Sequence, residues 1–245
     1  MTPLPALPDF FTLRRFAEID STNDEARRLA AAGAQSGLVV WADRQTAGHG
    51  RQGRAWQSPH GNLYCSILLR PDRAAADAAQ LGFAAALAVC EALPPGIEAR
   101  CKWPNDVLVG SRKIAGILLE SEASGARVSW LIVGVGINLA AHPEATDTPA
   151  ISLAALGKYA TPDAMLAAFC VRFLHWHETW RAHGFAPLRA SWLRRAHALG
   201  DEIRVRYGAV ETRGRFADLD ASGALVLENA EGTRHIAAGT VFPAG

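Results

Sequence analysis

The spacing of apolar residues predicts a mixture of strands and helices over residues 1–197. Stretches rich in apolar and β-branched residues predict strands at 11–19, 37–45, 62–71, 98–103, 106–121 and 127–140, and a Gly110-Ser111 turn divides 106–121 into a hairpin. Longer alanine- and leucine-rich stretches predict helices at 20–33, 77–93, 161–184 and 186–200. Residues 1–197 are therefore predicted to form a domain that contains both strands and helices.

The first predicted helix has a clear start and end. Ser21 or Thr22 suits the N-cap, and Asp24 or Glu25, three residues further on, completes a capping box. Gly33 is well placed to end the helix, because glycine adopts the left-handed backbone conformation that follows many helices.

The pattern changes near Gly200, after which only short strands are predicted. They cover 201–207, 210–219, 224–229 and 233–241 and are separated by turn residues. Several short strands in succession are typical of a small β-barrel. We therefore expect two domains, at 1–197 and 198–245.

Composition narrows the classes of function. Hydrophobic residues make up 49% of the 245 and charged residues 20%, which is enough for a buried core and argues against disorder. The net charge of +1 is too small for a protein that binds bulk nucleic acid or an anionic membrane. The apolar runs are shorter than a membrane span, and the first ten residues lack a signal-peptide pattern. A cytoplasmic protein is expected.

Cysteine and histidine spacing argues against a metal centre. The four cysteines, Cys65, Cys90, Cys101 and Cys170, form no CxxC pair and lie among apolar residues, so we expect buried free thiols. The eight histidines include no His-x-x-x-His pair, which removes the usual helical ligand spacing.

The loop "QTAGHGRQGRAWQSPHGN", residues 45–62, contains G-x-G-x-x-G but is not a dinucleotide fingerprint. That fingerprint requires a helix directly after the glycines, and the following "RAWQSPHGN" contains a proline and a glycine. Arg51 and Arg54 flank Gly53, and arginine presents a fork of donors that matches phosphate or carboxylate. We interpret the loop as an anion-binding loop.

Three further segments suggest a ligand site. "KWPND" places Lys102, Asn105 and Asp106 around a proline at a junction between strands. Lys113 lies in the apolar stretch "RKIAGILLE", where its charge would be costly to bury without an anion. "VGVGINL" ends a core strand with small residues and Asn138, as expected where a ligand lies close to the backbone.

These segments together resemble the biotin–protein ligases. "DSTNDEA", "QTAGHGRQGRAW", "GNLYCSILL", "KWPNDV", "RKIAGILLE", "VGVGINL" and "AAGTV" occur in the family's order over nearly the whole chain. The resemblance implies an α+β fold: a class II synthetase-like catalytic domain, which is a mixed β-sheet with helices, followed by an SH3-like β-barrel. It also implies ATP-dependent biotinylation: biotin and ATP form biotinyl-5′-AMP, and a carrier lysine then displaces AMP.

The resemblance assigns a role to each matching position. The residues matched to biotin binding are Ser21, Thr22, Asn23, Gln45, His49, Gly50, Arg51, Lys113, Gly116 and Gly134. Those matched to ATP and the adenylate are Arg51, Arg54, Trp56, Lys113 and Asn138. Arg51 and Lys113, with Mg²⁺ brought by ATP, are expected to neutralise charge at phosphorus, and Asp106 to orient or deprotonate the acceptor amine. No side chains are expected to form a metal site of their own.

Simpler explanations exist for several of these residues. Ser21 and Thr22 can serve only as helix caps, Asp106 as a turn residue, and Trp56 as a core anchor. At the level of function, a lipoate or octanoate transferase, a non-catalytic binding module and a DNA-binding repressor are the alternatives.

The implied partners are biotin, ATP and the biotin carboxyl carrier protein of acetyl-CoA carboxylase. About twenty residues precede the first family motif, too few for a helix-turn-helix domain, so we expect the monofunctional form without DNA binding. A homodimer formed through the edge of the sheet stays open.

Two loops are expected to close over the adenylate, which must be shielded from water. One is 47–61, predicted to become ordered with ligand. The other is 142–153, in which Ile151 is predicted to pack on adenine. His49 stands where the best-known loop pattern has arginine. Because histidine is only partly charged near pH 7, we hypothesise a weaker phosphate contact or pH-dependent adenylate retention.

Overall fold

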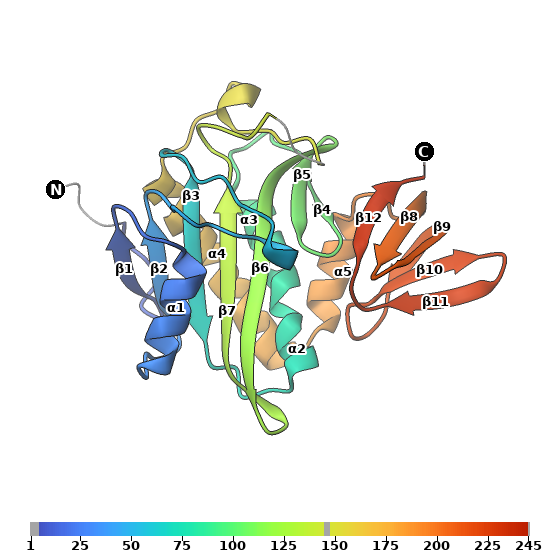
Figure 1. Ribbon diagram of the computed structural model, residues 1–245, viewed down its shortest axis with the longest axis horizontal. Helices are drawn as coiled ribbons and strands as arrows, with labels where there is room; N and C mark the ends of the chain where they lie inside the picture. The colour runs from blue at the N-terminus through green and yellow to red at the C-terminus, as the bar shows by residue number, and fades with distance from the viewer. Residues whose placement is uncertain (1–4, 145–147, 245) are drawn as a thin grey trace.

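The computed structural model describes residues 5–144 and 148–244 and contains two sheets (Figure 1). The larger sheet has the strand order β1-β2-β3-β7-β6-β5-β4, in which β1 and β2 are parallel and every other pair is antiparallel. Its strands are β1 (Thr12–Phe16), β2 (Leu38–Ala42), β3 (Leu63–Leu69), β4 (Ala99–Lys102), β5 (Asp106–Val109), β6 (Arg112–Ser124) and β7 (Arg127–Ile137). The predicted mixed sheet and the hairpin at Gly110 are confirmed.

The helices lie on both faces of this sheet. They are α1 (Thr22–Ala31), α2 (Ala75–Ala79), α3 (Leu81–Ala92), α4 (Pro162–His183) and α5 (Ala186–Arg194), with short 3-10 turns at Arg51–Gly53 and Ala154–Leu156. The main core forms where α3, α4 and α5 cover one face. On the other face α1 covers a smaller apolar cluster beside β2, β3 and β7, which leaves the rest of that face open for a site.

Two helix predictions need correction. The predicted helix at 77–93 is broken at Gln80 into α2 and α3. The predicted helix at 186–200 ends at Arg194, because the next residues pair with the edge strand β4: Cys101 N donates to Arg195 O, and His197 N donates to Cys101 O. Local sequence favoured a longer helix, and the free edge of the sheet provided the competing hydrogen bonds.

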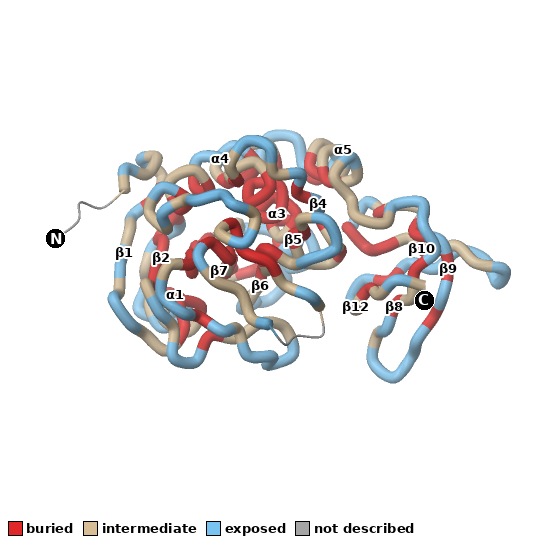
Figure 2. The backbone as a smooth tube through the Cα atoms, turned by 90° about the horizontal axis from the view of Figure 1, so that it is seen from above, coloured by how far each residue is buried: buried red, intermediate tan, exposed pale blue. Residues whose placement is uncertain are grey.

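The expectation that the apolar runs are too short for a membrane span needs correction: the stretch Ala75–Ala92 is long and apolar enough by length and composition. In the fold, 61% of it is buried, and α3 packs against α4 and the sheet. Figure 2 shows α3 among buried segments. Its apolar character is therefore that of a core helix.

The carboxyl-terminal strands form a second, antiparallel sheet with the order β11-β10-β9-β8-β12, which we call the C-terminal sheet. Its strands are β8 (Glu202–Tyr207), β9 (Val210–Leu219), β10 (Leu225–Asn229), β11 (Gly232–Ile236) and β12 (Thr240–Pro243). Within the described residues no ladder joins the edge strands β11 and β12, so hydrogen bonds do not close the sheet into a barrel. The predicted strand at 233–241 is divided between β11 and β12.

The C-terminal sheet is fixed to the larger unit by polar contacts. Trp103 Nε1 donates to Gly223 O at 3.1 Å, and Arg189 Nε on α5 donates to Leu219 O at 2.6 Å. Both contacts are made by the end of β9 and the turn after it, and Figure 1 shows the C-terminal sheet beside α5.

All four cysteines are buried and free, as predicted.

His177 on α4 is also a buried titratable group: its ring stacks against Phe173 and Trp180, and the residue is 5% exposed. Burial, reinforced by Arg181, lowers the pKa of His177 to about 4. The folded protein therefore holds this imidazole neutral near pH 7.

This histidine makes stability depend on pH. The folded pKa lies below the ordinary value of 6.5, so the stability contributed by the neutral ring is complete above pH 6.5 and is lost as pH falls toward 4. We expect about 2 kcal/mol of unfolding free energy to be lost at this residue by pH 5. In urea denaturation at pH 7, 6 and 5, His177→Phe should flatten the loss, whereas His175→Phe, at an exposed position, should not. Equal pH slopes in wild type and His177→Phe would contradict this assignment.

Candidate active site

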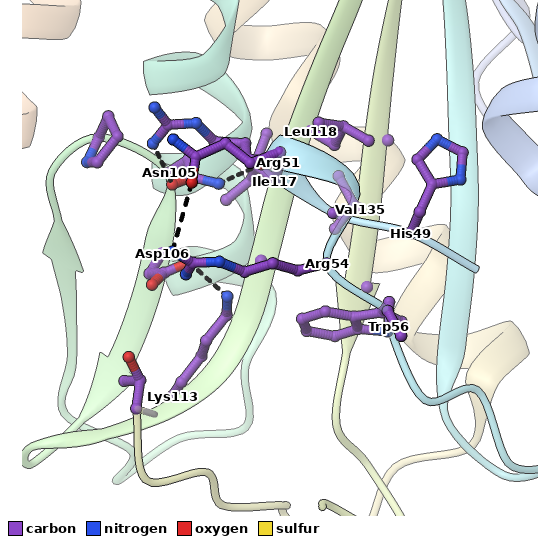
Figure 3. Close-up of a pocket in the computed structure, with 18 of the residues that line it drawn as sticks. His49, Arg51, Arg54, Trp56, Asn105, Asp106, Lys113, Ile117, Leu118 and Val135 are labelled. Carbon is purple, nitrogen blue, oxygen red and sulfur yellow. Dashed lines mark hydrogen bonds and ion pairs between the residues drawn. The ribbon is translucent and has the colours of Figure 1, made fainter. Parts of the chain in front are cut away.

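One cavity of about 510 Å³ opens on the α1 face of the larger sheet and reaches β12. Every residue predicted for the site lines it: Ser21, Thr22, Asn23, Gln45, His49, Gly50, Arg51, Arg54, Trp56, Asp106, Lys113, Gly116, Gly134 and Asn138. These residues come from α1, the glycine-rich loop, β5, β6 and β7, so the fold brings distant parts of the chain together (Figure 3).

The N-terminus of α1 forms one end of the cavity. Ser21 caps the helix, its Oγ accepting from the backbone N of Asp24 at 3.4 Å. Thr22 donates from both its backbone N, at 2.8 Å, and its Oγ1, at 3.1 Å, to Gln45 Oε1. The cap prediction for Ser21 is confirmed, and the amide and hydroxyl groups here form an uncharged polar surface.

Asn23 is held against the sheet floor beside this surface. Its Nδ2 donates to Glu120 Oε2 at 2.8 Å, and its Oδ1 lies 2.6 Å from Ser66 Oγ. A Cβ at Gly134 would lie 2.2 Å from Asn23 Oδ1. Glycine is required at 134 because the asparagine amide occupies the space that a side chain would fill.

Gly134→Ala is therefore expected to push Asn23 out of position and to destabilise the protein by about 1–3 kcal/mol, the usual cost of overpacking. The measurement is chemical denaturation of Gly134→Ala, Asn23→Ala and the double variant. Because the clash is with Asn23, the double variant should be more stable than the sum of the two single losses predicts. Simple additivity would show that the strain lies elsewhere.

The glycine-rich loop folds back on itself above the sheet. Trp56 N donates to Gly48 O at 2.9 Å, and Gly50 N donates to Arg54 O at 2.8 Å. The turn between them uses left-handed backbone at Gln52 and Gly53. A Cβ at Gly48 would lie 2.8 Å from Gln45 Nε2. The absence of a side chain at Gly48 therefore lets the loop pack closely against Gln45 at the polar end of the cavity.

Arg51 connects the loop to both structural units. Its Nη1 donates to Asn105 Oδ1 and to the carbonyl oxygen of Gly239, each at 3.2 Å. Asn105 is itself fixed, because its Nδ2 donates to Ile117 O at 2.7 Å. Burial lowers the pKa of Arg51, and the charge of Asp106 opposes that shift. The guanidinium keeps further donors for an anion.

Lys113 and Asp106 form an ion pair at the centre of the cavity. Lys113 Nζ lies 2.6 Å from Asp106 Oδ1 and 5.1 Å from the centre of the Trp56 ring. The backbone of Lys113 is fixed by the segment after the undescribed residues: its N donates to Pro149 O at 2.7 Å, and its O accepts from Ile151 N at 2.9 Å. Figure 3 shows the Arg54 side chain reaching toward this pair.

Asn138 supports the same segment from behind. Its Nδ2 donates to Ile151 O at 3.1 Å, and its side chain is buried. Ile151 itself is fully buried in the main core and does not line the cavity, so the prediction that it packs on adenine is wrong; Ala150 beside it lines the cavity instead. The central part of the predicted closing loop, 145–147, lies outside the described residues.

Trp56 stands on a floor of two glycines. A Cβ at Gly136 would lie 2.5 Å from indole Cε2, and one at Gly116 would lie 3.0 Å from Cζ3. The indole Nε1 is buried and has no hydrogen-bond partner among the described residues. The glycines of β6 and β7 thus leave room for a flat group over the sheet.

His49 lies away from the cationic centre. Its Nε2 is 3.7 Å from Glu120 Oε1, and its Nδ1 is 3.9 Å from Asp24 Oδ2. Figure 3 shows it across the cavity from Asp106 and Lys113. In this structure it faces carboxylates, so a direct phosphate contact would require the loop to move.

Several lining residues were not among the predicted site residues. Gly136 lies in the same "VGVG" motif as Gly134, and its spacing of two residues on a strand placed it on the same face. Gly239, Thr240 and Val241 come from the end of the chain. The motif "AAGTV" marked that segment, but only the fold shows that it reaches the cavity.

The cavity has an uncharged polar end at α1 and a cationic end at Arg51, Arg54 and Lys113. This layout suits an enzyme whose cavity binds a small polar molecule at one end and an anionic group at the other. Two family models match the chain: the biotin/lipoate A/B protein ligase family over residues 16–138, and the biotin protein ligase C terminal domain over residues 198–242.

Similar proteins agree with these matches. The biotin–acetyl-CoA-carboxylase ligase of Paracoccus denitrificans is 43% identical over 94% of this chain and 99% of its own. The structure of Aquifex aeolicus biotin protein ligase with biotin and ATP has a TM-score of 0.80 and 30% identity, covering 94% of this chain and 97% of that one. The Leishmania major ligase with biotinyl-5-AMP has a TM-score of 0.62 and 27% identity, covering 93% and 99%. The chain belongs to the biotin/lipoate A/B protein ligase family.

Proposed function

We propose that the protein is an ATP-dependent biotin–protein ligase that forms biotinyl-5′-AMP and transfers biotin to a lysine of a carrier protein. The observation that carries the proposal is the convergence of Arg51, Asp106 and Lys113 on one cavity whose other end is polar and uncharged. Similarity to ligases solved with biotin and ATP, and with biotinyl-5-AMP, supports it.

Biotin binds at the α1 end of the cavity. Thr22, Asn23 and Gln45 offer neutral donors and acceptors to its ring system, with Ser21 at the helix cap and Gly134 leaving room beside Asn23. Gly50 and His49 belong to the loop that covers the vitamin. Neutral polar groups suit the uncharged ring, and its carboxylate then points to the cations.

Adenylation takes place at the centre. The biotin carboxylate oxygen attacks the α-phosphorus of ATP, the bond from phosphorus to the bridging oxygen breaks, and pyrophosphate leaves with the electron pair. Lys113, Arg51 and Arg54 offset the negative charge that gathers at phosphorus, which is worth most in a site shielded from water. Trp56 and Gly116 form the walls beside it, and Asn138 holds the backbone of Lys113.

Magnesium enters as part of the ATP substrate. No group of three or more His, Cys, Asp or Glu side chains in the described parts of the chain is arranged to hold a metal ion. Mg²⁺ commonly keeps several waters and binds through substrate phosphates with few protein ligands, which suits its delivery with ATP.

Transfer uses the same centre. A neutral lysine amine of the carrier attacks the acyl carbon of biotinyl-5′-AMP, and AMP leaves. Asp106, whose carboxylate is paired with Lys113 and lines the cavity, accepts the proton or orients the amine.

The carrier is the biotin carboxyl carrier protein of an acetyl-CoA carboxylase, as the name of the Paracoccus relative suggests. We propose that residues 1–197 form the catalytic domain and 198–245 a C-terminal domain, in a cytoplasmic enzyme that binds neither DNA nor membrane. A homodimer joined through the edge of the sheet is compatible with this assignment.

A single assay tests the function. Purified protein is incubated with biotin, ATP, Mg²⁺ and a biotin carrier domain, and mass spectrometry follows the carrier lysine. Biotinylation of that lysine, absent when it is replaced by arginine, is the expected result. Parallel reactions with lipoate and octanoate test the other acids activated within this family; modification by one of these but not by biotin would refute the biotin assignment.

A further inference from the structure

Lys102 is a cavity residue that the proposed reaction has not yet used. It ends β4, the edge strand of the larger sheet, and lines the same cavity as Asp106 and Lys113. Strand register aligns Lys102 with Asp106, Asp106 with Gly116, and Gly116 with Gly136. These four residues form one row across β4, β5, β6 and β7.

The sequence of residues along this row shows where each part of the site lies across the sheet. Gly136 and Gly116 lie under Trp56, and a Cβ at Gly116 would lie 3.1 Å from Lys113 Nζ, which places that ammonium group over the row. Lys102 follows beyond Asp106, on the side of the Asp106–Lys113 pair that is away from α1. The cations therefore continue past the reaction centre toward the sheet edge.

The ammonium group of Lys102 has no hydrogen-bond or ion-pair partner within residues 5–144 and 148–244, although the side chain is partly buried. The charged groups that face it are Asp106, which raises its pKa, and Lys113, which lowers it; burial has the larger effect and lowers the pKa. Burial, and after it the charge of Lys102, lowers the pKa of the neighbouring His197. A lysine in such surroundings is stabilised when an anion binds.

The geometry of phosphoryl substitution indicates which anion would lie beside Lys102. The attacking and leaving oxygens lie on opposite sides of the phosphorus, roughly in line. If biotin approaches from the α1 end and phosphorus lies at Lys113 and Asp106, the leaving group extends away from α1, along the row toward Lys102.

We propose that Lys102 binds the β- and γ-phosphates of ATP and then the departing pyrophosphate, an inference that rests on the proposed function. In this step the carboxylate–phosphorus bond forms, the phosphorus–bridging oxygen bond breaks, and the electron pair leaves on pyrophosphate, whose added negative charge Lys102 offsets. A Cβ at Gly239 would lie 3.6 Å from Trp103, the neighbour of Lys102, and Thr240 and Val241 of β12 line the cavity, so the start of β12 borders the proposed pyrophosphate site.

The two half-reactions test this separately. In Lys102→Gln, adenylate formation from biotin and ATP should fall on the order of 100-fold, and inhibition by added pyrophosphate should weaken at least about 10-fold. Transfer from synthetic biotinyl-5′-AMP to the carrier should stay within about twofold, because pyrophosphate has already left. Lys102→Arg should recover most of the first half-reaction, and Lys158→Gln, outside the cavity, should change neither.

Equal slowing of both half-reactions, or unchanged inhibition by pyrophosphate, overturns the proposal. Thermal melting and biotin affinity establish that the variant is folded; if Lys102→Gln does not fold, Lys102→Met, which keeps most of the aliphatic stem, replaces it. Failure of the proposed function gives a different result. If wild-type protein exchanges pyrophosphate with lipoate or octanoate but not with biotin, the biotin assignment fails, and loss of that exchange in Lys102→Gln still supports the pyrophosphate site. No exchange with any acid overturns both.

Discussion

Lys113→Gln should slow formation of biotinyl-5′-AMP on the order of 1,000-fold. The ammonium group lies 2.6 Å from Asp106 at the centre of the cavity, where a glutamine amide can donate a hydrogen bond but carries no charge. The loss should appear mainly in the rate constant rather than in biotin affinity, because the charge to be offset develops as the reactants approach the transition state. Single-turnover formation of the adenylate, followed by rapid quench, measures it.

Arg112→Gln is the matched control. Arg112 precedes Lys113 on β6, so the same change of charge occurs one residue away at an exposed position outside the cavity. Its adenylation rate should stay close to that of wild type. A comparable loss in Arg112→Gln would mean that overall charge, rather than the placed ammonium group, drives the reaction.

The second large effect is expected at Asp106. Asp106→Asn keeps the shape of the side chain but removes its capacity to accept a proton, so transfer of biotin from preformed biotinyl-5′-AMP to the carrier should slow about 100-fold. The measurement is single-turnover transfer with synthetic adenylate at a fixed carrier concentration. Asn105, the preceding residue, accepts from Arg51 through its own amide and provides no such base.

The comparison between the two variants is more informative than either alone. Lys113→Gln should act chiefly on adenylation and Asp106→Asn chiefly on transfer, although the ion pair couples them. The double variant should therefore lose less than the product of the single losses in each half-reaction. If Asp106→Asn left transfer at the wild-type rate, Asp106 would be only the partner of Lys113.

The larger sheet was predictable because its strands carry strong local signals. Apolar runs such as Leu63–Leu69 are buried along their whole length, and the alternation and turn at Gly110 specified a hairpin. The site was predictable because its residues occur in short, dense motifs, and the glycines of "VGVG" are spaced to face one side of a strand. Each of these signals lies within about ten residues of sequence.

What could not be predicted depends on contacts between distant segments. The end of α5 at Arg194 follows from pairing with β4, about ninety residues earlier, which no local propensity reports. Ile151 is apolar in either setting, so sequence alone could not distinguish a core position from a place against a ligand. The approach of β12 to the cavity likewise depends on how the C-terminal sheet packs.

Arg51 Nη1 joins the glycine-rich loop to the segment before β12 through a contact that does not depend on a side chain at position 239. One of its two acceptors is the main-chain oxygen of Gly239, which is present whatever residue occupies that position. A change that displaces Gly239, such as a rearrangement of β12, therefore removes one of the two acceptors of Arg51 Nη1 and leaves Asn105 as the other. The position of the C-terminal strand therefore influences the position of Arg51 in the glycine-rich loop.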